Sequence, residues 1–506
     1  SDWSSDVCSS DLNTTPCVIT VRTLSVCKKK AAFCEPPVDK KSVPCGERAF
    51  FYDSDVCTCG RMRKFPRGRK AGSLGPLMPL APAGGSLRVK KCLCGLPTDK
   101  GDTMLKPKFL NCKRRLKMNF DYYIPTRILF GAGRLNDLHK QKLPGKKALI
   151  VISNGKSTRA NGYLARVEKE LELAGAAHVV FDKVQPNPTK DNVMEGAALA
   201  RAEACDFVLG LGGGSPIDAA KAIAVMAANP GDYWDYIAAG SGKGQPLANS
   251  PLPVVAVTTT AGTGTEADPW TVITKEDSNE KIGAGWPEVF PALSIVDPEL
   301  MMTVPPHLTA YQGFDALFHS TEGYLANCST PISDIYAIKA IELIGRSLAK
   351  AVKDGSDREA RADVALANTL SGMVESTSCC ISEHSLEHAL SAWHPNLPHG
   401  AGLIMISRAY YQTFVDKHAC DERMVAMAKA LGRKDADKAE DFVAALVDLQ
   451  KACGVDDLKM SDYGIDGGNL RRYAQTARET MGGLFALDPA PLDENECVEI
   501  LRQSYK

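Results

Sequence analysis

The chain has 506 residues, of which 44% are hydrophobic and 24% charged, and its 60 Lys and Arg balance its 60 Asp and Glu. This composition allows a large core in two or three domains and excludes a chain that is strongly basic or acidic throughout. No run of about 18 apolar residues occurs, so the sequence predicts no membrane-spanning helix.

Charge and cysteine are unevenly distributed along the chain. Residues 1–117 hold 23 Lys and Arg against 10 Asp and Glu, together with ten of the 17 cysteines. The remaining 389 residues hold 37 Lys and Arg against 50 Asp and Glu. Their seven cysteines show no spacing typical of a disulfide framework, except for the adjacent Cys379 and Cys380. We therefore expect a basic, cysteine-rich leader joined to an acidic, reduced, cytoplasmic protein.

Residues 1–117 lack sustained helical or strand periodicity, and their first dozen residues resemble translated adapter sequence. A zinc or nucleic-acid-binding role is the functional alternative, with Cys57, Cys59, Cys92 and Cys94 as candidate ligands. The spacing is C-x-C, however, and the segment contains no histidine. We interpret residues 1–117 as a disordered or non-native leader, with no nucleic-acid partner, and expect them to be dispensable for activity.

Order is predicted to begin at Met118. Two aromatic and β-branched runs separated by Pro125 predict a hairpin over 119–130, whose edge could pair two copies into a homodimer. From Lys146 onward, strands and helices alternate. We expect strands at Ala148–Ile152, His178–Phe181 and Phe207–Leu211, and helices at Gly162–Ala174 and Lys190–Ala204. This order predicts a parallel sheet covered by helices on both faces.

Two loops follow predicted strands and carry glycines or hydroxyl groups. The first reads Gly-Gly-Gly-Ser-Pro-Ile-Asp at 212–218 and opens a helix, so its backbone N–H groups could bind a pyrophosphate. The second, at 258–266, follows the strand Val254–Val257, and each loop could instead be only a solvated turn. Gly155-Lys156-Ser157 resembles part of a P-loop, but Ile150 stands where that motif needs glycine.

Beyond Pro306 the pattern predicts helices only. Asp315 and His319 are four residues apart on one predicted helix, and His384 and His388 repeat this spacing on another. His399 follows at a loop-to-helix junction. These five side chains are candidates for one divalent metal site, and their oxygen and imidazole donors suit Fe²⁺, Zn²⁺ or Mn²⁺ equally.

The order and spacing of these blocks resemble the iron-containing alcohol dehydrogenase family over residues 118–506. The blocks are the glycine turn at 212–218, Thr-Thr-Ala-Gly-Thr at 259–263, Phe-Asp-Ala-Leu-Phe-His at 314–319, and Glu-His-Ser-Leu-Glu-His with Leu-Pro-His-Gly-Ala-Gly within 383–402. The resemblance implies a Rossmann-like NAD(P)-binding α/β domain at 118–303. An all-helical catalytic domain would follow at 304–506, as in dehydroquinate synthase-like architectures.

The resemblance also assigns roles to individual residues. It implies that Asp315, His319, His384 and His399 hold the metal, with iron favoured, and that His388 relays a proton. The implied cofactor-binding residues are Ser153, Asn154, Lys156, Ser157, Asn187, Gly213, Gly214, Ser215, Asp218, Thr259, Thr260, Thr263 and Lys281. The loop after the first strand lacks the Asp that some members use to exclude a 2′-phosphate, which favours NADP over NAD.

The implied reaction is reversible hydride transfer between a primary or small alcohol and nicotinamide. Glycerol dehydrogenase-like polyol oxidation and a dehydroquinate synthase-type lyase are the alternatives within this architecture. Trp270, Phe318 and Trp393 are candidate pocket residues by position alone. His394 could also line the pocket, but Pro395 beside it favours a rigid loop.

Overall fold

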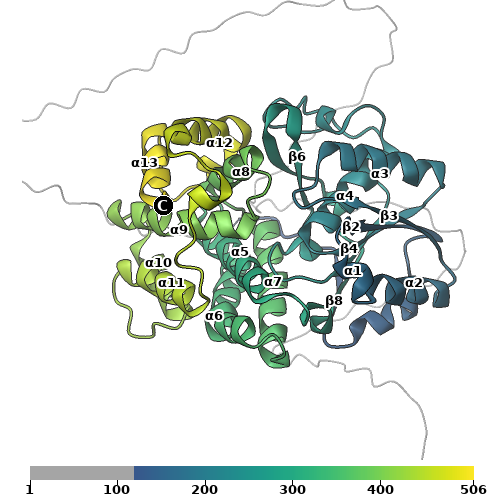
Figure 1. Cartoon of the computed structure of the whole chain (residues 1–506), viewed down its shortest axis with the longest axis horizontal. Coiled ribbons are helices and arrows are strands. Elements are labelled where there is room, and N and C mark those ends of the chain that lie inside the picture. The colour runs from purple at the N-terminus through teal and green to yellow at the C-terminus, as the bar shows by residue number, and fades with distance from the viewer. Residues whose placement is uncertain (1–118) are drawn as a thin grey trace, which may run out of the picture. The chain divides into compact units, whose positions relative to one another are not determined.

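The computed structural model describes residues 119–506, so the predictions for residues 1–117 lie outside the described chain. Figure 1 shows two parts side by side, a sheet with its helices in blue to teal and a group of helices in green to yellow. None of the described helices is long and apolar enough to span a membrane.

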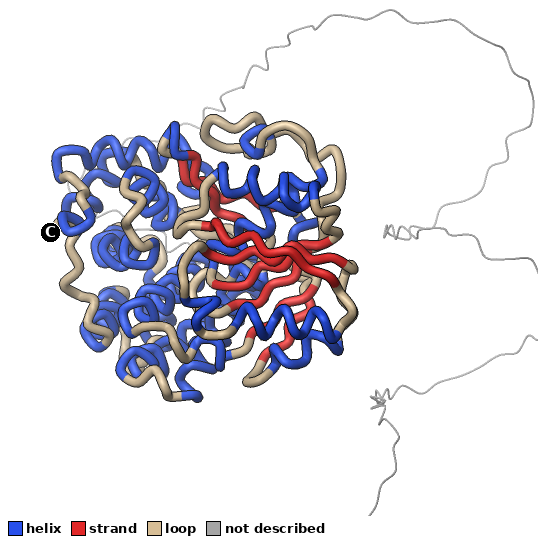
Figure 2. The backbone as a smooth tube through the Cα atoms, turned by 45° about the vertical axis from the view of Figure 1, so that its right-hand side comes forward, coloured by secondary structure: helices blue, strands red, loops and turns tan. Residues whose placement is uncertain are grey.

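The first part is built on a six-stranded sheet whose neighbouring strands all pair in parallel, in the order β1-β8-β5-β4-β2-β3. Figure 2 shows these strands as a twisted layer with helices above and below it. The strands are β1 (Arg127–Phe130), β2 (Lys147–Ser153), β3 (Ala177–Val184), β4 (Phe207–Gly212), β5 (Val254–Thr258) and β8 (Leu293–Val296).

Both faces of this sheet are buried, as strand β2 shows. Leu149 and Val151 belong to a core shared with α3 (Lys190–Ala202) and α4 (Gly214–Ala228). Ile150 and Ile152 point the other way, into a core shared with α2 (Tyr163–Leu173) and the 3-10 helix η1 (Arg134–Lys140). Each such aliphatic side chain contributes about 1.5–3 kcal/mol on burial. A continuous apolar run therefore becomes a central parallel strand.

The second part contains helices but no strand among the described residues after Val296. The prediction of an all-helical second half is confirmed. Its helices are α5 (Pro306–Leu325), α6 (Pro331–Lys353), α7 (Arg358–Thr377), α8 (Ser382–Trp393), α9 (His399–Asp416), α10 (Asp421–Ala430), α11 (Glu440–Ala452), α12 (Leu470–Phe485) and α13 (Glu494–Ser504).

The hairpin predicted over 119–130 is wrong. Residues 119–126 form no strand, and β1 alone joins the sheet, in parallel with β8. The aromatic run does not pack as a strand because Tyr122 and Tyr123 are exposed. Within residues 119–506, an antiparallel hairpin instead forms from β6 (Trp270–Lys275) and β7 (Glu280–Gly285), and the sequence pattern did not predict it.

Candidate metal and cofactor site

Three helices bring the predicted metal ligands together around one carboxylate oxygen. Asp315 and His319 lie on α5, His384 on α8, and His399 is the first residue of α9. Asp315 Oδ1 lies 3.5 Å from His319 Nδ1, 3.6 Å from His384 Nε2 and 3.4 Å from His399 Nε2. The structure therefore gathers all four residues that the sequence nominated as ligands.

The polar atoms at this point lack partners. Asp315 Oδ1 and His384 Nε2 are buried and make no hydrogen bond. Buried polar atoms are almost always paired in folded proteins, so two such atoms facing each other are suited to holding a cation between them. One carboxylate oxygen with imidazole nitrogens is a donor set that fits Fe²⁺ or Zn²⁺.

Carboxylates behind two imidazoles orient them toward this point. Glu322 Oε1 binds His384 Nδ1, and Glu387 Oε2 binds His399 Nδ1. Because each Nδ1 is engaged in this way, Nε2 is left free to ligate an ion. The sequence analysis missed both glutamates, although each lies three residues from a predicted ligand, which places it near that ligand on the helix.

We expect Glu387→Gln to weaken metal binding by about 10–100-fold, because the amide holds the His399 ring less firmly than the carboxylate does. Iron content after dialysis against graded chelator measures the effect. Glu342→Gln is a suitable control, since Glu342 is exposed on α6. Equal retention of iron by both variants would contradict the role given to Glu387.

Burial keeps two of the histidines neutral. It lowers the pKa of His319 to about 3, so His319 carries the neutral imidazole that metal binding requires. Burial, with Lys281 and His399 nearby, also lowers the pKa of His388 well below its usual value. The near-neutral pKa from which the proton-relay role of His388 was argued is therefore not found, and that role rests on the position of His388 in the cavity.

The predicted pyrophosphate loop lies at the start of α4. A Cβ on Gly213 would stand 2.7 Å from Thr260 Oγ1, and one on Gly214 would stand 2.5 Å from Thr263 Cγ2. The two glycines therefore let the loop after β4 approach the loop after β5. No side chain caps the first turn of α4. Its N–H groups are available to a phosphate, as the dipole of a helix N-terminus favours.

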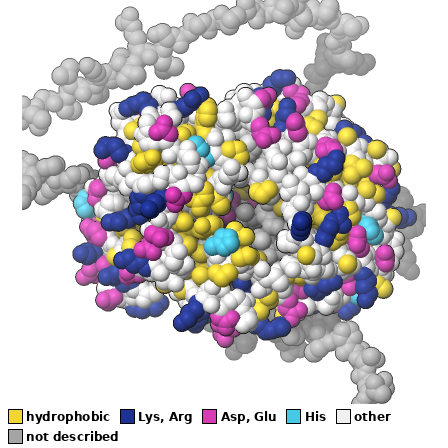
Figure 3. Space-filling model, viewed as in Figure 1, with side chains coloured by type: hydrophobic (Ala, Val, Ile, Leu, Met, Phe, Trp, Pro, Cys, Tyr) yellow, Lys and Arg dark blue, Asp and Glu magenta, His cyan; other side chains and the backbone are white. Residues whose placement is uncertain are grey.

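One cavity joins this loop to the histidine cluster. Figure 3 shows hydrophobic side chains around a hollow between the two parts of the molecule. The predicted residues that line the cavity are Asn187, Gly214, Ser215, Asp218, Thr263, Lys281, His319, His384, His388 and His399. The others are not part of its lining: Asp315 on α5, Gly213 at the start of α4, Thr259 and Thr260 in the loop after β5, Ser153 at the end of β2, and Asn154, Lys156 and Ser157 just after that strand.

Lys281 links the two sides of the cavity. Its Nζ donates to Asn187 Oδ1 at 3.1 Å and to Ser391 Oγ at 2.9 Å, and it lies 3.7 Å from Glu387 Oε2. The cation therefore stands beside the carboxylate that orients His399. Lys281, near the start of β7, thus connects this strand with α8.

Asp218 lines the cavity, and its carboxylate is also held in a buried polar network. Its carboxylate accepts from Thr265 Oγ1 at 2.7 Å and from the Val272 N–H at 2.9 Å, and burial raises its pKa to about 6. Lys221, which is fully buried, donates to Asp268 Oδ1 at 3.0 Å in the same network. The sequence analysis did not identify Lys221 or Asp268.

The positional guesses about pocket residues were partly wrong. Trp270 lines the cavity, but Phe318 is fully buried in the helical core and Trp393 lines a different hollow. His394 ends α8, lies 2.9 Å from Tyr473 Oη and is outside the cavity lining, as expected of a rigid loop residue. The cavity lining also includes Glu375, Cys379 and Cys380, which the sequence pattern did not assign to it.

Known proteins match the whole described part of the chain. Residues 125–298 match the model of the iron-containing alcohol dehydrogenases, and residues 309–505 match that of their C-terminal region. Alcohol dehydrogenase 4 of Saccharomyces cerevisiae is 33% identical over 76% of this chain and 98% of its own length. NAD-dependent methanol dehydrogenase of Bacillus methanolicus is 33% identical over 66% of this chain and 87% of its own length.

Solved structures agree with these sequences. The crystal structure of an archaeal halo-thermophilic alcohol dehydrogenase from a Red Sea brine pool superposes with a TM-score of 0.73 at 33% identity, covering 77% of this chain and 100% of that one. The same family is indicated by the fold, by the cluster of Asp and His side chains and by the sequence matches over both parts of the molecule. The chain belongs to the iron-containing alcohol dehydrogenase family and is an oxidoreductase that acts on the CH–OH group of alcohols.

Proposed function

We propose that this alcohol dehydrogenase holds Fe²⁺ on Asp315, His319, His384 and His399 and oxidises a primary or small alcohol with NAD. The observation that carries the proposal is the unpaired Asp315 Oδ1 with three imidazole nitrogens within 3.6 Å of it. Zn²⁺ and Mn²⁺ satisfy the same donors, so the choice of iron rests on the family.

When bound, the ion supplies Lewis-acid chemistry to the alcohol oxygen, and the nicotinamide supplies the hydride acceptor. The protein's own residues position these groups. Glu322 and Glu387 fix the rings of His384 and His399, and Lys281 holds Asn187 at the cavity wall. Met481 and Leu484 add apolar surface to the cavity lining.

His388 stands close to the reacting centre on α8. Its ring centroid lies 5.2 Å from that of His399, and its Nδ1 lies 3.0 Å from Met481 Sδ. As a neutral imidazole it can accept the alcohol proton and pass it outward. The proton-relay role therefore stays a proposal, resting on position in the cavity.

The test is alcohol oxidation by metal-free protein and by protein reconstituted anaerobically with Fe²⁺. We expect reduced nicotinamide to form only in the reconstituted sample, and chelator to abolish the reaction. Parallel assays with Zn²⁺ and Mn²⁺ identify the productive ion. Equal rates with and without metal would contradict the proposal.

NADP is proposed as a second acceptable cofactor. Ser153 ends β2, and Asn154 and Lys156 follow it without any carboxylate, so nothing there repels a 2′-phosphate. We expect Lys156→Glu to lower kcat/KM for NADP by about tenfold or more, a cost near 1.4 kcal/mol, while kcat/KM for NAD changes little. Steady-state kinetics with both cofactors measures this. Unchanged discrimination would show that Lys156 does not meet the 2′-phosphate.

We further propose a domain boundary between residues 303 and 304, where the sheet part gives way to α5. Strand β1 lies at an edge of the sheet. An edge strand offers unpaired backbone groups, so we propose homodimerisation through β1. We also propose a cytoplasmic location. Size-exclusion chromatography that gives only monomer would remove the dimer proposal.

A further inference from the structure

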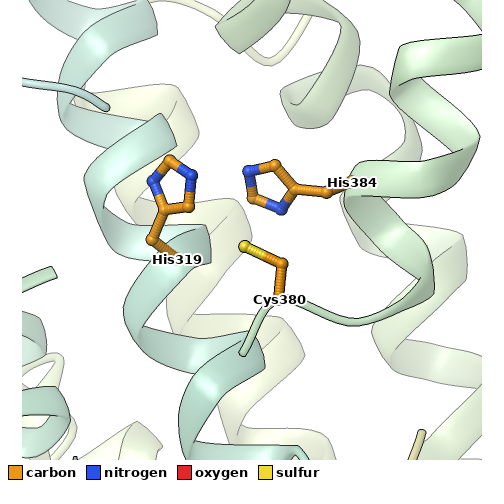
Figure 4. A group of neighbouring side chains, drawn as sticks. All are labelled: His319, Cys380 and His384. Carbon is orange, nitrogen blue, oxygen red and sulfur yellow. The ribbon is translucent and has the colours of Figure 1, made fainter. Parts of the chain in front are cut away.

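Cys380 lies in the connection between α7 and α8, directly before Ile381, which caps α8. Its Sγ and nitrogen atoms of His319 and His384 all lie within 4.8 Å of one another. Figure 4 shows the two imidazole rings facing each other, with the sulfur of Cys380 directed toward the space between them. The ring centroids are 4.3 Å apart and nearly parallel, with an angle of 27°.

A second observation comes from His384. Its side chain is 5% exposed, and its Nε2 has no hydrogen-bond partner. His384 belongs to two groups of donor atoms, one with Asp315 and His399 and one with His319 and Cys380. His319 is not part of the first group. His384 therefore links the group that contains the Asp315 carboxylate with the group that contains the Cys380 thiol.

We propose that Cys380 is an additional donor of the metal centre, so that an ion held by His319 and His384 also takes the sulfur of Cys380. The inference rests on the proposed metal site. On binding, a metal–sulfur bond forms, the S–H bond breaks, and its proton passes to solvent. A thiolate is a softer ligand than a carboxylate or an imidazole. The site then holds Zn²⁺ and Co²⁺ more tightly than Mn²⁺.

Cys379 offers a matched control for this inference. It is adjacent in sequence and lines the same cavity, but it belongs to none of the donor groups found among the described residues. Replacing either cysteine with Ser removes one sulfur from the same wall. Only the loss of Cys380 should change the ligands of the ion.

The experiment loads the full-length chain with one equivalent of Co²⁺ and records the near-ultraviolet sulfur-to-cobalt charge-transfer absorbance per bound cobalt. We expect Cys380→Ser to lose part of the absorbance that the wild-type protein shows, and Cys379→Ser to lose none. Any contribution from the cysteines of residues 1–117 is common to all three proteins and cancels. Cys380→Ala provides a second variant if the Ser form does not fold.

Equal absorbance per cobalt in wild type and the Cys380 variants, or an equal loss in Cys379→Ser, would overturn the inference. His384→Ala separates this failure from failure of the proposed function. If the metal site itself is wrong, His384→Ala keeps the wild-type cobalt content. If only the role of Cys380 is wrong, His384→Ala loses cobalt while Cys380→Ser leaves the absorbance unchanged.

Discussion

His384→Ala is expected to release the metal ion and to lower kcat/KM for alcohol oxidation by about a thousandfold or more. A Lewis-acid ion contributes several kcal/mol to such a reaction, and each 1.36 kcal/mol is about tenfold in rate. His384 belongs both to the group with Asp315 and His399 and to the group with His319 and Cys380, and its Nδ1 is fixed by Glu322. Its loss leaves Asp315 Oδ1 buried with one imidazole fewer.

His394→Ala is the matched control, because His394 ends the same helix but lies outside the cavity lining. We expect this variant to keep its iron and to retain kcat/KM within a few-fold of wild type. Steady-state kinetics and iron analysis on the same preparations give both quantities. Full activity of His384→Ala at low iron content would contradict the assignment of the metal site.

Lys221→Met is expected to lower the free energy of unfolding by about 3–5 kcal/mol, because it leaves the buried Asp268 carboxylate without its cation. Lys221 Nζ also donates to Thr265 Oγ1 at 2.6 Å and to the Trp270 carbonyl at 2.8 Å, so these acceptors lose a donor as well. Denaturant titration followed by circular dichroism measures the change. Asp218 belongs to the same network through Thr265, so we expect the loss of Lys221 to loosen the cofactor side of the cavity as well.

Lys140→Met provides the surface control, since the Lys140 side chain is 61% exposed. Such a change typically alters stability by about 0.5 kcal/mol or less. The double variant Lys221→Met with Asp268→Leu should recover much of the loss, because it removes both charges together. A Lys221→Met protein as stable as Lys140→Met would show that the buried pair is not needed for folding.

The sequence predicted the central sheet because strands buried on both faces are continuous apolar runs. The apolar residues of Ala148–Ile152 and Phe207–Leu211 became β2 and β4 for this reason. The hairpin of β6 and β7 escaped prediction because Trp-Thr-Val-Ile-Thr-Lys at 270–275 does not alternate strictly and Gly283 and Gly285 interrupt the pattern of β7. The aromatic run before Pro125 was wrongly predicted to be a strand, because tyrosines are common in strands but Tyr122 and Tyr123 are exposed here.

The metal ligands could be predicted because two pairs of Asp or His residues at i, i+4 spacing, Asp315 with His319 and His384 with His388, are uncommon in one chain. Their supporting residues could not, because a single Glu on a helix is usually a solvated residue. Glu322 and Glu387 become recognisable only when folding buries them against His384 and His399. Cys380 gave no signal either, since its approach to His319 depends on how α7 and α5 pack.

The measurement that tests the metal site most directly is anomalous X-ray scattering at the iron edge from crystals grown with Fe²⁺. We expect one strong anomalous peak within bonding distance of Asp315 and of the imidazoles of His319, His384 and His399. A peak elsewhere in the chain, or none in crystals of active enzyme, would contradict it.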